Sequence, residues 1–188
     1  RLDPAGQSSL YLAGGVARPR ALSGSNMAEQ AASYYDALYA GRESYHALYS
    51  DSLYFPLWVQ VEFGLRPHRE KKILDIGCGP GQFARFLEDR GYKRYEGIDF
   101  SETAIAMARK TCGFPVRVAD AFSPQVLQSP YDVVVCTEVL EHVQHDRDLV
   151  RQIRIGTHCF LSVPNYDDPG HVRFFRSEYA VRSRYYRL

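Results

Sequence analysis

Two carboxylates and an imidazole occur together in the run Glu138-Val-Leu-Glu-His142. Glu138 and Glu141 are three residues apart, so one helical turn would direct both carboxylates the same way, with His142 adjacent. Carboxylate oxygens and imidazole nitrogens bind divalent cations such as Mg²⁺, Mn²⁺ or Zn²⁺. An imidazole is also a general base near neutral pH, and the same side chains can simply shape a pocket wall. Three interpretations therefore stay open: metal ligands, a general base, or a pocket wall.

A second group of residues suited to ligand binding surrounds three glycines. The pattern predicts a short buried strand over Ile73–Ile76, and Gly77, Gly79 and Gly81 follow at every second position. Glycines let the backbone approach a ligand closely, and a helix N-terminus offers unpaired N–H groups. The spacing differs from the dinucleotide fingerprint G-x-G-x-x-G. Asp99 ends the next predicted strand, about twenty residues beyond the glycines, where ribose hydroxyls of a nucleoside ligand would find an acceptor.

Five runs in this sequence together resemble the motifs of a known family. They are Leu74-Asp-Ile-Gly-Cys-Gly-Pro-Gly81, Gly97-Ile-Asp-Phe-Ser-Glu102, Ala119-Asp-Ala-Phe122, Tyr131-Asp-Val-Val-Val-Cys-Thr-Glu-Val-Leu-Glu-His142 and Leu161-Ser-Val-Pro-Asn165. Their order and spacing resemble those of the class I S-adenosylmethionine-dependent methyltransferases. The resemblance implies an α/β, Rossmann-like fold with a mostly parallel central sheet, flanking helices and a helical N-terminal cap. It also implies S-adenosyl-L-methionine as cofactor and S-adenosyl-L-homocysteine as product.

The resemblance assigns a cofactor site residue by residue. The three glycines would face the methionine and ribose portions, with Asp75 nearby, and Asp99 would bind the ribose hydroxyls. Asp120 would accept a hydrogen bond from the exocyclic amine of the adenine. The complete set expected at the cofactor is Asp75, Gly77, Cys78, Gly79, Gly81, Asp99, Phe100, Asp120, Ala121, Phe122 and Thr137. Cys78 is expected to fill a tight loop as a small residue rather than to act as a nucleophile.

The Glu-x-x-Glu-His run resembles two methyltransferase groups in particular. These are the ubiquinone-biosynthesis O-methyltransferases and the small-RNA 3′-terminal 2′-O-methyltransferases, and in both the equivalent run supports a divalent metal. In the RNA group a further downstream histidine completes the site, and His171 takes that place here. The expected catalytic residues are therefore Glu138, Glu141 and His142, and the expected metal ligands are these three together with His171.

Composition divides the chain into three segments. Residues 1–26 are rich in Gly, Ala, Ser, Pro and Arg without periodicity, so we expect a linker or tag-like segment there, with Met27 as the natural start. Residues 27–66 predict a helical N-terminal cap with many aromatic side chains. Tyr34, Tyr35 and Tyr39 share a face of it, either lining the acceptor site or packing the cap onto the sheet. Residues 67–188 form the Rossmann-like cofactor-binding domain.

Within this domain, strand and helix patterns alternate as a parallel sheet requires. We expect strands at 72–76, 94–98, 115–118, 131–136 and 157–163. We expect helices at 81–90, 101–110 and 146–154.

The family resemblance implies two further antiparallel strands, for which little sequence remains after residue 167, so we expect truncation or a missing tail. The Arg-rich run 174–188 predicts a helix with aromatic side chains inward, or alternatively a basic arm for phosphate groups.

Charge and cysteine content narrow the functional classes. The formal net charge of the 188 residues is +1, which provides no overall attraction to nucleic acid or to a membrane. The four cysteines show no metal or disulfide spacing, which indicates reduced thiols and a cytoplasmic protein.

We expect an S-adenosylmethionine-dependent methyltransferase acting on an oxygen or nitrogen of a small molecule, with a homodimer conceivable. The alternatives are a metal-assisted RNA 3′-terminal 2′-O-methyltransferase and an inactive cofactor-binding module that acts through a partner.

Overall fold

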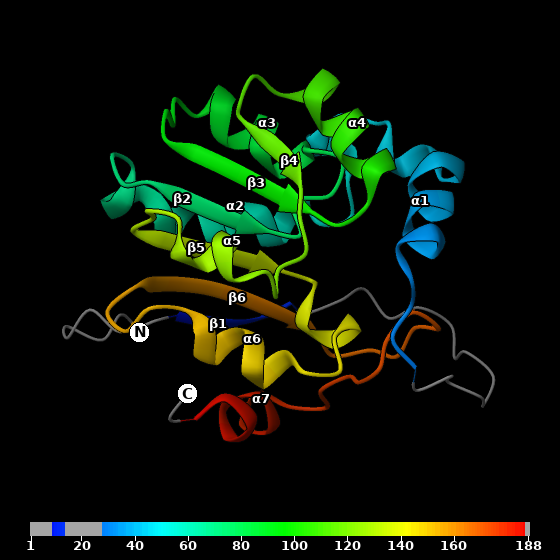
Figure 1. The fold of residues 1–188 in the computed structure, drawn as a ribbon, viewed down its shortest axis with the longest axis vertical. Coiled ribbons are helices and arrows are strands. Elements are labelled where there is room, and N and C mark those ends of the chain that lie inside the picture. Colours follow the sequence, from blue (N-terminus) through cyan, green and yellow to red (C-terminus); the bar gives the residue numbers. More distant parts are fainter. Residues whose placement is uncertain (1–8, 14–27, 187–188) are drawn as a thin grey trace.

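Parallel strands form the central sheet of the molecule (Figure 1). The computed structural model describes residues 9–13 and 28–186. The six strands of the sheet lie in the order β1-β6-β5-β2-β3-β4, and each neighbouring pair is parallel. Their bounds are β1 Ser9–Ala13, β2 Ile73–Ile76, β3 Tyr95–Asp99, β4 Val116–Val118, β5 Val133–Thr137 and β6 His158–Pro164. The strand order reverses between β2 and β5, and in open α/β sheets ligands bind at the carboxyl ends of the strands beside such a reversal.

Helices connect the strands and cover both faces of the sheet. The α-helices are α1 Ala32–Gly41, α2 Phe55–Leu65, α3 Gln82–Asp89, α4 Glu102–Thr111, α5 Pro124–Gln128, α6 Asp146–Gln152 and α7 Glu178–Tyr185. Four short 3-10 turns complete them: η1 Glu43–Tyr45, η2 Tyr49–Asp51, η3 Arg66–His68 and η4 Leu140–His142. Ser101 begins α4 because its hydroxyl accepts the N–H of Ala104 at 3.0 Å.

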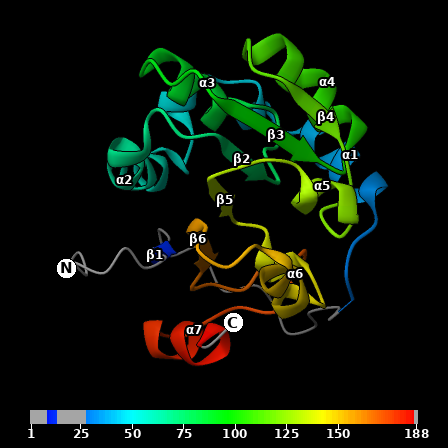
Figure 2. The ribbon, with the colours of Figure 1, turned by 60° about the vertical axis from the view of Figure 1, so that its left-hand side comes forward.

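The apolar residues of the strands alternate between two cores. Ile73 packs with the helices α2, α3 and α4, whereas Leu74 and Ile76 pack with α5, α6 and α7. Figure 2 shows α6 and α7 on the opposite side of the sheet from α2 and α3. Both faces of the strands are therefore buried, which explains the nearly continuous apolar sequence of β5.

The N-terminal cap is attached to the sheet domain by two sets of hydrogen bonds. Asp36 of α1 accepts the hydroxyl of Ser101 at 2.5 Å and a backbone N–H in the first turn of α4 at 3.1 Å. The amide of Gln82, the first residue of α3, donates to the carbonyls of Ser44 and Ala47 at 3.1 and 2.8 Å. The cap therefore contacts the two helices that begin beside the glycine loop and beside Asp99.

The predicted sheet is confirmed, with differences at its two ends. All five strands expected between residues 72 and 163 are present, with bounds shifted by one or two residues. The linker expected over residues 1–26 is wrong in part, because Ser9–Ala13 pairs with β6 as an edge strand; the rest of that segment lies outside the described residues. After β6 the described chain forms α7 and no antiparallel strand, and α7 accounts for the Arg-rich run.

Candidate functional site

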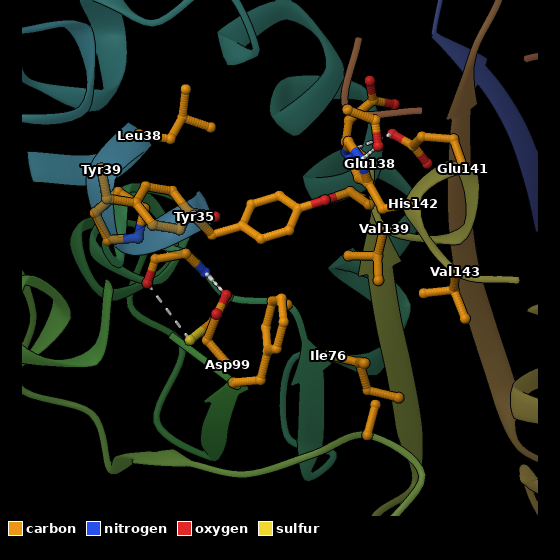
Figure 3. A pocket seen from close by; sticks show the side chains of 18 of the residues that line it. Tyr35, Leu38, Tyr39, Ile76, Asp99, Glu138, Val139, Glu141, His142 and Val143 are labelled. Atoms are coloured by element: carbon orange, nitrogen blue, oxygen red, sulfur yellow. Dashed lines mark hydrogen bonds and ion pairs between the residues drawn. The ribbon is translucent and has the colours of Figure 1, made fainter. Parts of the chain in front are cut away.

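A pocket opens at the carboxyl ends of β2, β3 and β5, with α1 forming one wall (Figure 3). It brings together nearly all of the residues that the sequence singled out. The predicted residues that line it are Asp75, Gly77, Cys78, Gly79, Asp99, Phe100, Asp120, Ala121, Phe122, Thr137, Glu138, Glu141, His142 and His171. Gly81 is the exception, since it lies beneath the loop rather than at the pocket.

The glycine loop needs glycine for two different reasons. Gly77, Gly79 and Gly81 all have positive φ angles, between 53° and 82°, which side chains disfavour. A Cβ atom on Gly77 would also collide with Val139, whereas a Cβ on Gly81 would lie 2.9 Å from the Cα of Ala108 in α4. Gly81 therefore allows α3 to pack against α4, while Gly77 and Gly79 expose their backbone to the pocket.

Asp99 is held in place by backbone donors. The N–H of Gly79 donates to Oδ2 and the N–H of Ser101 to Oδ1, each at 2.9 Å. The carboxylate is buried, and burial raises its pKa in spite of these two bonds. Because each carboxylate oxygen can accept more than one hydrogen bond, Asp99 can still receive two hydroxyl groups of a ligand.

Asp75 carries an unpartnered oxygen at the same end of the pocket. The hydroxyl of Tyr95 donates to Oδ2 at 2.5 Å, and Oδ1 is buried without a hydrogen-bond partner among the described residues. Burial raises the pKa of Asp75 to about 7. An unsatisfied buried carboxylate suits a positively charged ligand group, so the residues present fit the ammonium and the ribose of a nucleoside-amino acid cofactor.

The remaining predicted cofactor residues lie at or after the ends of three strands, β3, β4 and β5. Asp120 is exposed and closes a local turn by accepting the N–H of Phe122 at 2.9 Å. Phe100 follows β3, and its ring centroid is 5.2 Å from that of Tyr35 in the cap. Thr137 is the last residue of β5 and is paired with Ser162 of β6. Phe100, Asp120 and Thr137 all line the pocket.

Glu138 is not on a helical turn, contrary to the sequence prediction. It has a φ of 56° and lies between β5 and the 3-10 turn η4, so the spacing to Glu141 does not reflect helical geometry. Ser162 fixes Glu138 from both sides: its hydroxyl accepts the backbone N–H at 3.1 Å and donates to Oε1 at 2.9 Å. A non-glycine residue in this left-handed region stores strain, and such strain concentrates at functional sites.

Glu141, His142 and His171 converge at the other end of the pocket. Each offers one ligand atom, and these atoms lie within 4.8 Å of one another. Nδ1 of His142 is 2.8 Å from the carbonyl of Gly170, so it carries the proton and leaves the lone pair on Nε2. Both oxygens of Glu141 and Nδ1 of His171 are buried without hydrogen-bond partners among the described residues.

The electrostatics of this cluster distinguish the three interpretations. Burial raises the pKa of Glu138 and of Glu141, and the charge of Glu138 raises that of Glu141 further. Burial lowers the pKa of His142 to about 4, so the ring is neutral at pH 7 and a weak base. A pocket wall would leave the unpartnered buried atoms at a large desolvation cost. The metal-ligand interpretation accounts for both observations, because a cation lowers carboxylate pKa values and binds a neutral imidazole.

The cap contributes aromatic side chains to the pocket. Tyr35 extends across it toward Glu138 and His142 in Figure 3, and its ring centroid is 5.5 Å from that of His142. Its hydroxyl is buried and unpartnered among the described residues. The other apolar and aromatic cap side chains that line the pocket are Tyr34, Leu38, Tyr39, Tyr45, Tyr54 and Trp58, and the polar ones are Glu29, Gln30 and Arg42.

Two residues that support the site were not found from the sequence. Ser162 fixes Glu138, and the carbonyl of Gly170 fixes the tautomer of His142. A serine inside the apolar strand β6 is a usable signal, since a buried hydroxyl needs a partner. A backbone carbonyl carries no sequence signal.

Comparison with known proteins agrees with this arrangement. Residues 57–186 match a family model described as a methyltransferase domain. A ubiquinone biosynthesis O-methyltransferase from Pseudomonas aeruginosa (strain UCBPP-PA14) is 33% identical over 118 residues, which cover 57% of this chain and 49% of that protein. The crystal structure of the plantazolicin methyltransferase BpumL, with a desmethyl substrate analogue and SAH, is 20% identical with a TM-score of 0.52, over 70% of this chain and 52% of that one. The PH0226 protein from Pyrococcus horikoshii OT3 is 21% identical with a TM-score of 0.53, over 67% and 65%.

The family match covers well over half of the chain, and the sheet and pocket agree with it. The chain belongs to the class I S-adenosylmethionine-dependent methyltransferase family, as the resemblance in the sequence implied. It spans about half the length of the curated relatives that it matches.

Proposed function

We propose that this chain carries out S-adenosylmethionine-dependent methyl transfer to an oxygen or nitrogen of a small molecule. The observation that carries the proposal is the pocket whose two ends hold an oriented Asp99 and the Glu141–His142–His171 cluster. A sulfonium already activates its methyl group, so the protein needs mainly to align the acceptor and remove its proton.

Two carboxylates beside the glycine loop, Asp99 and Asp75, would bind the polar groups of the cofactor. Asp99 binds the ribose hydroxyls, since backbone donors hold both of its oxygens in position. The free oxygen of Asp75 binds the ammonium of the methionine portion. Asp120 and Phe122 flank the adenine. These assignments rest on the contacts of the protein side chains and on the family to which the chain belongs.

Glu141, His142 and His171 would hold a divalent cation, with Glu138 close by. Two imidazole nitrogens and one carboxylate form a donor set that favours Mn²⁺, Zn²⁺ or a similar transition metal over Mg²⁺, which prefers oxygen ligands. When bound, such a cation lowers the pKa of an acceptor hydroxyl. The protein positions the cluster: Gly170 holds the ring of His142, and Ser162 holds Glu138 in its strained conformation.

The acceptor is proposed to be a small molecule rather than RNA. Its space lies between Tyr35 and the Glu–His cluster, and aromatic side chains of the cap supply most of that wall. The basic segment that RNA would require is partly neutralised, because Arg184 pairs with Asp146 at 2.6 Å and Arg182 with Glu178 at 2.6 Å.

We also propose that the protein is cytoplasmic and that it can form a homodimer. No helix in the described part of the chain is long and apolar enough to cross a bilayer. All four cysteines are free and buried, which supports a reducing, cytoplasmic setting. A homodimer through the aromatic cap is consistent with the exposed side chains of Leu48, Leu53 and Phe63.

The test combines binding and turnover. Isothermal titration with S-adenosyl-homocysteine should show one site per chain, and native mass spectrometry should show a metal that EDTA removes. Catechols, phenols, amines and a short RNA are then offered as acceptors, with S-adenosyl-homocysteine release as the readout. No cofactor binding would contradict the proposal. Methylation of the RNA alone, with a steep loss at higher salt, would replace it with the RNA alternative.

A further inference from the structure

Arg173 reaches from the segment after β6 into the turn of residues 138–144, which we name the site turn. Its Nη1 donates to the carbonyl of Leu140 at 2.6 Å and also to the carbonyl of Val143. Its Nη2 donates to the carbonyl of Gln144 at 2.9 Å. The side chain is 16% exposed, and it is not among the residues that line the pocket. One guanidinium therefore donates hydrogen bonds to three backbone carbonyls of the site turn without lining the pocket.

The backbone beside Arg173 is bonded to the same turn. The N–H groups of Val172 and Arg173 donate to the carbonyl of Glu141, at 2.8 and 3.3 Å. The carbonyl of Gly170, two residues before Val172, accepts a hydrogen bond from the Nδ1–H of His142. The short segment from Gly170 to Arg173 thus bonds to Glu141 and His142 directly, and through the guanidinium it bonds to carbonyls on both sides of them.

A buried carboxylate fixes the position of Arg173 in turn. Asp146 at the start of α6 is 1% exposed and lies 3.5 Å from Nη1 of Arg173. The same carboxylate accepts two bonds of 2.6 Å from Arg184 and one of 2.7 Å from the hydroxyl of Tyr185, both in α7. A buried charge with this many partners has little freedom to move, so the guanidinium is aimed at the site turn.

The chemistry of this contact calls for arginine specifically. The carbonyls at the end of a short helical turn have no partners within the turn. A planar guanidinium offers five donors in a rigid fork, whereas the ammonium of lysine is a compact charge that cannot span three separated acceptors. Arg173 does not act on a substrate directly, because it is not among the residues that line the pocket. Its effect must pass through the site turn.

We propose that Arg173 is a positioning residue that holds the site turn so that Glu141 and His142 converge with His171. Asp146 and α7 behind it keep the guanidinium in place. The inference rests on the proposed function, since the convergence serves a divalent cation there. Groups that orient metal ligands in this way typically account for about 10–100-fold in metal affinity or activity.

The experiment compares Arg173→Met and Arg173→Lys with wild type and with Arg182→Met. Arg182 is the matched control because it is exposed and, within the described residues, its one ion pair is with Glu178 on the surface of α7. Three quantities are measured: amide hydrogen exchange of residues 138–144, Mn²⁺ affinity by electron paramagnetic resonance, and S-adenosyl-homocysteine affinity by calorimetry. Thermal unfolding checks that each variant is folded.

We expect Arg173→Met to speed exchange in the site turn about 10-fold or more and to weaken Mn²⁺ binding about 10–100-fold. S-adenosyl-homocysteine affinity should stay within about twofold, because the glycine loop and Asp99 do not contact Arg173. Arg173→Lys keeps the charge beside Asp146 and should fold, but it should still loosen the turn. If Arg173→Met does not fold, the lysine variant decides the outcome.

Exchange and Mn²⁺ affinity equal to those of Arg182→Met in both Arg173 variants would overturn the inference. Wild type that binds no Mn²⁺ would contradict the proposed metal role instead. In that case, faster exchange in the Arg173 variants would still support positioning, and unchanged exchange would reject it.

Discussion

The two ends of the pocket differ in how the protein satisfies their buried polar atoms. At the glycine loop, backbone N–H groups already donate to both oxygens of Asp99. At the Glu–His cluster, both oxygens of Glu141 and Nδ1 of His171 have no partner among the described residues. The first end is organised by the backbone before any ligand arrives. The second end is electrostatically costly until a positively charged group enters it, so the protein maintains it at the expense of stability.

Among the variants that test this difference between the two ends, Glu141→Gln is expected to have the largest effect. Removing the buried carboxylate should lower methyl transfer by about 10²–10³-fold, because the cluster loses its charged ligand. The metal-free protein should be as stable as wild type or more stable by about 1 kcal/mol, because folding no longer has to bury a carboxyl group that must either stay charged without a partner or take up a proton. Activity assays and urea unfolding without metal measure both effects, with Glu178→Gln on the surface as control. Activity within about twofold of wild type would contradict a metal-ligand role for Glu141.

A smaller effect, confined to the other end, is expected from Asp99→Asn. The amide cannot accept as many hydrogen bonds as a carboxylate, so S-adenosyl-homocysteine affinity should fall about 10–100-fold, as for lost charge-assisted bonds. Mn²⁺ affinity should not change, since Asp99 is outside the Glu–His cluster. Calorimetry with each ligand separates the two results, and Asp51→Asn on the surface is the control. Equal losses for both ligands would mean that the two ends are not independent.

Asp75 departs from the pattern of its own end, and its expected effect is on the pH dependence of stability. Its pKa is raised from 3.8 to about 7 in the folded protein, so the folded state holds the proton more tightly than the unfolded state. The stabilisation from this proton is present at low pH and is lost as pH rises from about 4 to about 7. The difference in free energy of unfolding between wild type and Asp75→Asn should change by about 1–4 kcal/mol across that window. Urea unfolding at several pH values measures it, and a flat difference would contradict the burial argument.

The comparison also shows which parts of the site the sequence could reveal. The Asp99 end follows from strand, glycine and helix signals that are local in sequence, so the predicted residues line the pocket as expected. Gly81 alone serves packing against Ala108, which depends on where α4 lies. The sheet was predictable for the same reason, because buried parallel strands have apolar runs bounded by turns.

The Glu–His end was less predictable because its geometry comes from tertiary contacts. Helical spacing suggested that Glu138 and Glu141 point the same way, but a positive φ at Glu138 and a bond from Ser162 set its direction. The edge strand Ser9–Ala13 was missed because its sequence carries little periodicity and its pairing with β6 is distant in sequence. Long-range pairing overrides weak local patterns.

The hydrogen bonds that fasten the cap have a consequence for the timing of turnover. Asp36 bonds to the start of α4 immediately after Asp99, and Gln82 joins the end of the glycine loop to the cap. If the cap moves to release a spent cofactor, these bonds are the ones that break, and lid movements of this kind often set the rate of multiple turnover. Product departure is therefore expected to be the slow step of the cycle, with the first turnover faster than those that follow.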